Sequence, residues 1–140
     1  MALVSLCAEQ VGGAEKCLSM AVDYAKMRHQ FGQPIGSFQA IKHKCADMLT
    51  LVESARSASY YAAWVAAHQP NLLATAISMA KAYCSDTFFR CAGENIQIHG
   101  GIGFTWEHEA HHYFKRASTT QSLLGSPSDY RKRYADLVEI

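Results

Sequence analysis

The sequence predicts an all-α fold, most simply a four-helix bundle of antiparallel long helices followed by short C-terminal helices. Three observations predict it. Apolar residues recur every three or four positions over three long segments, breaks rich in glycine or proline separate those segments, and no run alternates like a strand. With 140 residues, 49% of them hydrophobic, the chain can bury one sizeable core, so we expect a single domain over residues 1–140.

The first predicted helix covers residues 2–29, where apolar side chains share one helical face: Leu3, Leu6, Val11, Ala14, Leu18, Val22 and Ala25. Gly12 and Gly13 interrupt this pattern, and we interpret the pair as a point of close helix packing. Gly32, Pro34 and Gly36 then fall within six positions, which predicts a turn.

Ser37 is a suitable N-cap for a second helix that extends to about His68, where Pro70 follows. A third helix extends from there to about Ile98 and ends at a turn rich in glycine. Two short helices are predicted after it, over residues 106–116 and, after Pro127, over residues 129–138.

Composition excludes several classes of protein. Thirteen basic and twelve acidic residues leave a net charge of +1, so no overall field favours nucleic acid or an anionic membrane. The five cysteines are odd in number and form no CxxC pair, which favours buried thiols over disulfides or structural zinc. The apolar N-terminus is too short to span a membrane. We therefore expect a soluble cytoplasmic protein.

The candidate binding residues lie at predicted helix ends. Arg28 offers a planar fork of donors that suits a phosphate, although an arginine at a helix C-terminus also interacts favourably with the helix dipole. Gln39 and Gln97 could bind a sugar or a base edge, and Phe31 could equally be a core residue. The GGIG turn after Ile98 permits positive φ and close approach to a ligand, as any glycine C-cap would.

Residues 108–112 spell HEAHH, which satisfies the HExxH pattern of zinc hydrolases. His108 and His112 would bind the metal and Glu109 would activate water. No third ligand follows at the usual spacing, so we interpret the run as the histidine-rich face of an exposed helix and expect no metal.

Two runs considered together resemble the C-terminal helical domain of the FAD-dependent acyl-CoA dehydrogenases: YAKMRHQFGQPIGSFQAIKHKCADM over residues 24–48 and NIQIHGGIGFTWEHEAHHYFKRA over residues 95–117. The resemblance covers nearly the whole chain. It implies a subunit of three parts, of which the N-terminal helical domain and the middle β-domain are absent here. It also implies a helical bundle that builds a homo- or hetero-oligomer, dimer or tetramer.

The resemblance also implies FAD as the cofactor, shared between subunits. Arg28 matches an arginine that contacts the FAD pyrophosphate of a neighbouring subunit. The other implied contacts are Gln30, Phe31, Gln39, Gln97, Ile98, His99, Gly100, Gly101 and Ser126.

The family's catalytic base has no counterpart at either of its two known positions. The glutamate that removes the α-proton of the acyl-CoA is replaced by Leu124, and the position used by a second subgroup is Ala2. Glu9 lies two helical turns from Ala2, about 10 Å too far to act in its place. We therefore expect no catalytic residue in this chain.

These observations predict the FAD-binding and oligomerisation domain of an acyl-CoA dehydrogenase that is inactive in isolation. The substrate acyl-CoA would bind only to the intact enzyme. Two alternatives stay open: a subunit of a heteromeric dehydrogenase whose partner supplies the base, and a helical scaffold module without cofactor. A zinc hydrolase is a distant third.

Overall fold

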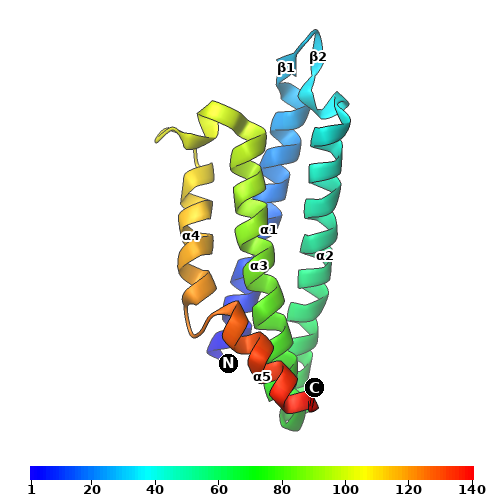
Figure 1. Ribbon diagram of the computed structural model, residues 1–140, viewed down its shortest axis with the longest axis vertical. Helices are drawn as coiled ribbons and strands as arrows, with labels where there is room; N and C mark the ends of the chain where they lie inside the picture. Colours follow the sequence, from blue (N-terminus) through cyan, green and yellow to red (C-terminus); the bar gives the residue numbers. More distant parts are fainter.

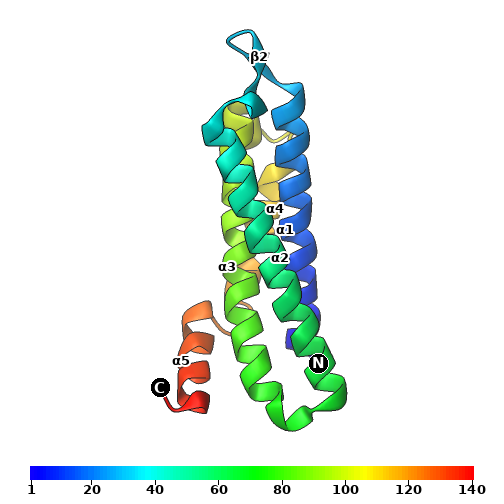
Figure 2. The ribbon, with the colours of Figure 1, turned by 90° about the vertical axis from the view of Figure 1, so that its right-hand side faces the viewer.

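The computed structural model describes residues 1–140 and confirms the all-α class. Four helices run alternately up and down, and a fifth lies across the lower end of the third (Figure 1, Figure 2). The helices are α1 (Ala2–Met27), α2 (Gln39–His68), α3 (Leu73–His99), α4 (Ala110–Ser122) and α5 (Pro127–Val138). None of them is long and apolar enough to cross a membrane.

Helix α3 is the centre of the bundle, since it packs against α1, α2, α4 and α5 (Figure 1). The buried residues form two clusters, one toward each end. The upper cluster contains Ala14, Cys17, Ala21, Ala25, Met48, Val52, Phe88, Cys91, Ala92, Ile98 and Ala117. The lower one contains Cys7, Val11, Ala55, Ala62, Ile77, Ala80 and Cys84. Small side chains dominate both clusters, so the helix axes can approach closely.

The glycine pair in α1 marks close packing at only one of its two positions. A Cβ atom on Gly13 would lie 2.6 Å from Cε2 of Phe88, a core residue of α3. A Cβ on Gly12 would have no neighbour within 4 Å. Gly13 therefore lets the Phe88 ring lie against the backbone of α1.

The turn between α1 and α2 is a small β-hairpin, which the sequence pattern did not predict. Strands β1 (His29–Gln30) and β2 (Gln33–Pro34) pair antiparallel around Phe31 and Gly32, whose φ angles are +53° and +80°. Two successive positive φ values are typical of a tight two-residue hairpin turn.

The expected cap at Ser37 is wrong. Ser37 ends a short 3-10 turn, η1 (Ile35–Ser37), and Phe38 is the N-cap of α2 without a side-chain hydrogen bond. The reason is packing, because a Cβ on Gly36 would lie only 3.0 Å from the carbonyl oxygen of Ala25. This segment lies against α1, so the helix begins only after it.

The first short helix is also displaced from its predicted range. A 3-10 segment, η3 (Gly100–Phe104), folds back over the end of α3, and α4 begins only at Ala110. Helix α5 starts at Pro127, two residues earlier than predicted. Ser126 and Asp129 form a reciprocal capping box, and Pro127 occupies the first turn.

Candidate functional site: one polar end and one apolar hollow

The hairpin end of the bundle presents the first group of predicted site residues. Arg28 follows α1 with extended backbone, φ −77° and ψ 121°, and its carbonyl oxygen accepts a 2.7 Å hydrogen bond from the N–H of Ile35. Its side chain is exposed and takes part in no ion pair within the chain. Gln30 and Gln39 are exposed beside it, at the hairpin and at the first residue of α2.

Phe31 is the most exposed aromatic residue of the hairpin. Ninety per cent of its surface is accessible, and its ring makes an edge contact with Phe38 at 6.1 Å between centroids. The possibility that Phe31 belongs to the core is therefore wrong. An aromatic ring held out by a tight turn, next to an unpaired arginine, suits a planar ligand that carries phosphate.

The end of α3 lies at the same end of the bundle (Figure 1). Gln97, Gly100 and Gly101 are exposed, and Gly100 has a φ of +64°, a conformation that favours glycine. A Cβ on Gly100 or Gly101 would have no neighbour within 4 Å, so the backbone at this turn is open to a ligand.

Ile98 and His99 also belong to this run, but their side chains face inward and can contribute only backbone groups. Ile98 is 4% exposed. The His99 ring donates from Nδ1 to the carbonyl oxygen of Asn95 at 2.8 Å and stacks on Tyr24 at 4.3 Å. Burial lowers the pKa of His99, and the neighbouring His108 lowers it further.

Ser126 is the N-cap of α5, and α5 begins at the opposite end of the bundle from the β1–β2 hairpin that follows Arg28 (Figure 1). Its side chain already accepts from the N–H of Asp129 in the capping box. Within one protomer, Ser126 and Arg28 therefore do not form one site.

Ala2 and Leu124, which occupy the expected positions of a catalytic base, line one hollow of about 370 Å³. Leu124 lies in the turn between α4 and α5 with a φ of +61°. All the side chains that line the hollow are apolar or aromatic: Met1, Ala2, Leu3, Val4, Leu73, Ile77, Leu124 and Tyr130. Two positions at opposite ends of the chain thus converge, and neither offers a carboxylate.

A buried lysine beside this hollow has no counterpart in the sequence predictions. Lys81 is fully buried, and its ammonium donates to Ser85 Oγ at 2.8 Å and to the carbonyl oxygens of Gln121 at 3.0 Å and Thr120 at 3.2 Å. Burial lowers the pKa of Lys81. Because the two carbonyls end α4, the ammonium stabilises the negative end of that helix dipole.

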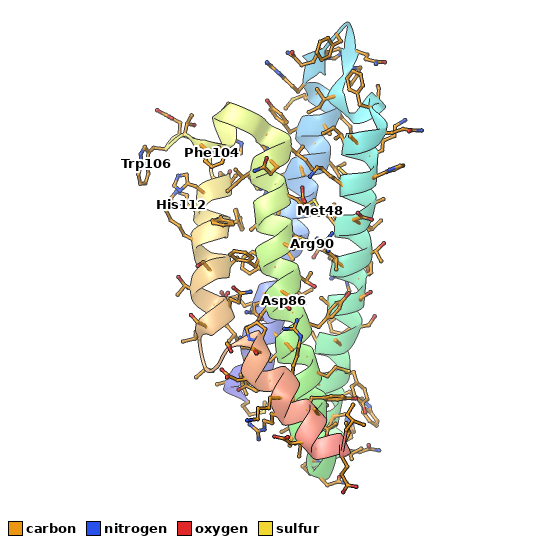
Figure 3. All side chains as sticks on the ribbon, in the orientation of Figure 1. Met48, Asp86, Arg90, Phe104, Trp106 and His112 are labelled. Carbon is orange, nitrogen blue, oxygen red and sulfur yellow. The ribbon has the colours of Figure 1, made fainter.

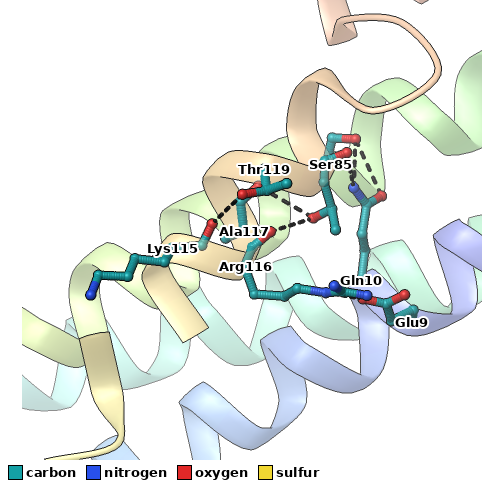
Figure 4. A network of polar contacts seen from close by, with 8 residues as sticks. Glu9, Gln10, Ser85, Lys115, Arg116, Ala117 and Thr119 are labelled. Atoms are coloured by element: carbon teal, nitrogen blue, oxygen red, sulfur yellow. Dashed lines mark hydrogen bonds and ion pairs between the residues drawn. The ribbon is translucent and has the colours of Figure 1, made fainter. Parts of the chain in front are cut away.

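Gln10 joins α1 to the same network. Its amide nitrogen donates to Ser85 Oγ and to the Thr120 carbonyl oxygen, each at 3.0 Å. Figure 4 shows Gln10 and Ser85 linked in this way, with Glu9 and Arg116 forming a 2.6 Å ion pair nearby. The only sequence signal for Lys81 is its position one turn after Ile77, next to an apolar stripe.

The HEAHH run does not form the helical pair of a zinc hydrolase. His108 precedes α4, where its Nδ1 accepts from the N–H of Ala110, and its ring lies 4.4 Å from that of His99. His112 lies in α4, on the side of the molecule that carries Phe104 and Trp106 (Figure 3). No group of three or more potential ligands in the chain could hold a metal ion.

The structure thus defines a helical bundle with an open polar end suited to an anion and an apolar hollow at the other end. A family model described as the acyl-CoA dehydrogenase C-terminal domain matches residues 3–130. The chain belongs to the acyl-CoA dehydrogenase family, and it corresponds to the C-terminal domain of that family.

Individual relatives agree. The chain is 46% identical over 132 residues to acyl-CoA dehydrogenase IpdE2 of Mycobacterium tuberculosis. The aligned region covers 94% of this chain and 40% of that relative. The structure of butyryl-CoA dehydrogenase from Megasphaera elsdenii superposes with a TM-score of 0.93 at 31% identity, over 99% of this chain and 36% of that one. A chain of the ChsE4–ChsE5 complex from M. tuberculosis superposes with a TM-score of 0.92 at 32% identity, over 98% of this chain and 37% of that one. The chain spans about two fifths of the length of these relatives.

Proposed function

We propose that this chain supplies the pyrophosphate-binding part of an FAD site, and a subunit contact, in an acyl-CoA dehydrogenase. That enzyme is an oxidoreductase that desaturates an acyl-CoA thioester between its α- and β-carbons. Bound FAD would supply the acceptor for the hydride that leaves the β-carbon. The observation that carries the proposal is the open hairpin end, where the exposed Arg28 has no ion-pair partner.

The residues at this end have complementary roles. The Arg28 guanidinium would bind two phosphate oxygens through its fork of donors. Phe31 would cover an aromatic face, while the amides of Gln30, Gln39 and Gln97 would orient the polar groups of the nucleotide. The backbone at Gly100 and Gly101 would approach the adenine end closely, because no side chain is present there.

Distance within the protomer supports a cofactor shared between subunits. Ile77, which lines the hollow with Leu124, is separated from Gln97 by 20 residues of α3, or roughly 30 Å. Ser126 follows directly after the Leu124 turn, so one FAD molecule cannot reach both Ser126 and the polar end of the same protomer. A site that uses both ends needs two protomers.

The subunit contact fits a groove between α2 and α3. It has a volume of about 530 Å³ and is lined by Ser54, Ser57, Ala58, Tyr61, Met79 and Tyr83. Helix α2 contributes three small residues, and each helix contributes one exposed tyrosine, Tyr61 from α2 and Tyr83 from α3. Small residues beside exposed aromatic ones form the kind of surface into which a helix packs. The same surface would serve the alternative role, a scaffold module without cofactor.

The apolar residues at both base positions favour the heteromeric form of the proposal. Neither Ala2 nor Leu124 can accept a proton, so a different subunit would supply the base. One structural neighbour, at 32% identity, is a complex of two different chains, ChsE4 and ChsE5. A heteromer in which this chain provides part of the FAD site fits both facts.

Titration of the chain with FAD, followed by flavin fluorescence, tests the cofactor role. We expect Arg28→Ala to weaken binding by roughly 10- to 100-fold, the effect of losing charge-assisted hydrogen bonds. Arg133→Ala, on α5, is the matched control, because Arg133 is also exposed and unpaired. Equal affinity of the two variants would exclude Arg28 from the site, and no FAD binding at all would favour the scaffold.

The same sample tests whether the chain lacks a catalytic base. With FAD, an acyl-CoA and an electron acceptor, we expect no reduction of the acceptor by the chain alone. Measurable turnover would show that a base has been overlooked.

A further inference from the structure

The buried ring of His99 joins three segments at the polar end of the bundle. It stacks on Tyr24 of α1, with 4.3 Å between the ring centroids, and its Nδ1 donates to the Asn95 carbonyl oxygen within α3. The η3 segment lies against it, since a Cβ on Gly103 would lie 3.1 Å from the His99 Cβ. The ring of His108, in the loop that leads to α4, lies 4.4 Å from that of His99.

Backbone groups that do not titrate fix opposite tautomers in the two histidine rings. Nδ1 of His99 must carry a proton, because a carbonyl oxygen can only accept. Nδ1 of His108 must have a lone pair, because it accepts from the N–H of Ala110 at 3.1 Å. Ala110 is the first residue of α4, so His108 satisfies a helix N–H that has no partner within the helix.

A second proton on either ring would disturb this arrangement. On His108 it would occupy Nδ1, so two N–H donors would face each other at the start of α4, where the helix dipole also disfavours a cation. On His99, which is only 6% exposed, it would place a charge out of contact with water. With both rings protonated, two cations would lie 4.4 Å apart.

The groups near His99 do not offset a positive charge on it. Tyr24 faces it from α1 as an uncharged phenol. Glu94, five residues earlier in α3, is paired with Lys44 of α2. Burial accordingly lowers the pKa of His99 below its ordinary value of 6.5, and His108 lowers it further.

The groups near His108 also leave such a charge unpaired. Glu107 and Glu109 flank it in the sequence, but both are exposed and neither forms an ion pair with a histidine. His111, in the first turn of α4, has its Nε2 3.4 Å from the Trp106 carbonyl oxygen and could add only positive charge.

From these contacts we infer that His99 and His108 form a proton-sensitive latch, closed when both rings are neutral, that positions the glycine turn relative to the hairpin. Tyr24, on which His99 stacks, accepts through its carbonyl oxygen from the Arg28 N–H at 2.8 Å. Gly100 directly follows His99. The latch thus connects the two halves of the polar end, and it rests on the proposed function only for its effect on FAD.

The latch should open as the pH falls. The open segment binds protons near the ordinary histidine pKa of 6.5, whereas the closed latch excludes them. The closed form is therefore fully favoured above pH 6.5. Below that value, the ratio of closed to open forms falls by up to about tenfold per pH unit for each histidine, until the pKa of the closed form is reached.

Nitrogen-15 NMR of the 140-residue chain tests the latch directly. At neutral pH we expect the proton on Nδ1 in His99 and on Nε2 in His108, and the titration of His99 should have its midpoint below 6.5. Hydrogen exchange at the Ala110 amide, corrected for the intrinsic effect of pH, should lose protection by roughly tenfold per pH unit below 6.5.

Asparagine variants separate the proton from the fold, because an asparagine amide can replace Nδ1 without titrating. His108→Asn keeps an acceptor for the Ala110 N–H, so this amide should stay protected at low pH. His68→Asn is the matched control, since Nδ1 of His68 also contacts a carbonyl oxygen four residues earlier, that of Trp64 at 2.9 Å, and its ring stacks on Trp64 without a second histidine. It should lose Ala110 protection as the original chain does. Circular dichroism verifies the fold of each variant.

FAD titration over the same pH range provides a second readout. The affinity of the original chain should fall by about tenfold between pH 7 and pH 5, and that of His108→Asn should fall less. Equal loss of Ala110 protection in these two chains would overturn the latch, as would a His99 midpoint at or above 6.5, because Tyr24 would then stabilise the cation. An FAD affinity that does not change with pH would overturn the positioning role. If protection changes as expected but FAD binds at no pH, the latch stands and the proposed cofactor role fails.

Discussion

Substitution of Gly13 by alanine should destabilise the bundle, although alanine is the better helix former. The added Cβ would lie 2.6 Å from Cε2 of Phe88 and closer still to its Cζ, and the Phe88 ring is only 1% exposed. Forcing such a ring to move in a packed core costs about 2 kcal/mol. Replacing glycine inside a helix returns about 1 kcal/mol. The net loss in the free energy of unfolding is therefore about 1 kcal/mol.

The neighbouring glycine is the control, because it should respond with the opposite sign. Gly12 is exposed and lies in the same helix, and a Cβ there meets no atom within 4 Å, so Gly12→Ala should stabilise by about 1 kcal/mol. Denaturant unfolding followed by circular dichroism measures both variants, and their melting temperatures should differ by about 6 °C.

A third variant tests the cause. Phe88→Leu removes the ring atoms that the new methyl would meet, so adding Gly13→Ala to Phe88→Leu should cost less than adding it to the original chain. If Gly13→Ala is as stabilising as Gly12→Ala, the contact between α1 and Phe88 is not as close as described, and the reasoning fails.

Two further predictions concern buried ionisable groups. Burial, with a contribution from neighbouring Cys91, raises the pKa of Cys17 to about 12, and burial raises that of Cys91 to about 12 as well, from an ordinary 9.0. Above pH 9 the unfolded chain releases these protons while the folded chain retains them. The free energy of unfolding should therefore fall between pH 9 and 12, by up to about 1.4 kcal/mol per pH unit for each thiol, and urea unfolding of Cys17→Ala should show a shallower fall. Lys81→Met should lower the free energy of unfolding by about 1–2 kcal/mol, because the Gln121 carbonyl loses its donor and the Thr120 carbonyl retains only that of Gln10, whereas Lys42→Met at an exposed position of α2 should have no effect; equal stability of the two variants would show that the ammonium contributes nothing to the buried network.

The long helices were predictable because burial repeats along them, whereas their ends were not. Ile41, Cys45, Met48 and Val52 repeat at helical spacing, and α2 follows that pattern closely. Its first residue depends instead on Gly36, which lies against the Ala25 carbonyl of α1. The start of α4 depends similarly on Gly103, where a Cβ would lie 3.0 Å from the carbonyl oxygen of Ile96. Each boundary therefore depends on how a turn packs against the end of the helix that precedes it, and the spacing of apolar residues does not encode that contact.

The candidate site likewise contains some features that the sequence predicted and others that it did not. Arg28 and the glycine turn could be found from the sequence because they combine an unusual residue type with a helix end. The hollow could not, since its lining joins the first four residues to Leu124 and Tyr130, and the spacing of apolar residues carries no sign of that meeting. Lys81 was missed because two of its partners are backbone carbonyls about forty residues away, which any sequence would provide.

The central place of α3 has a consequence for the order in which the chain can fold. The face of α1 that carries Ala14 and Cys17 forms a cluster with Phe88 and Cys91, more than seventy residues later. A growing chain that contains only α1 and α2 would therefore keep much of that face in water. Helical proteins usually fold fast because most of their contacts are short-range in sequence. Here the contacts that bury α1 are distant in sequence, so the docking of α3 should limit the rate of folding.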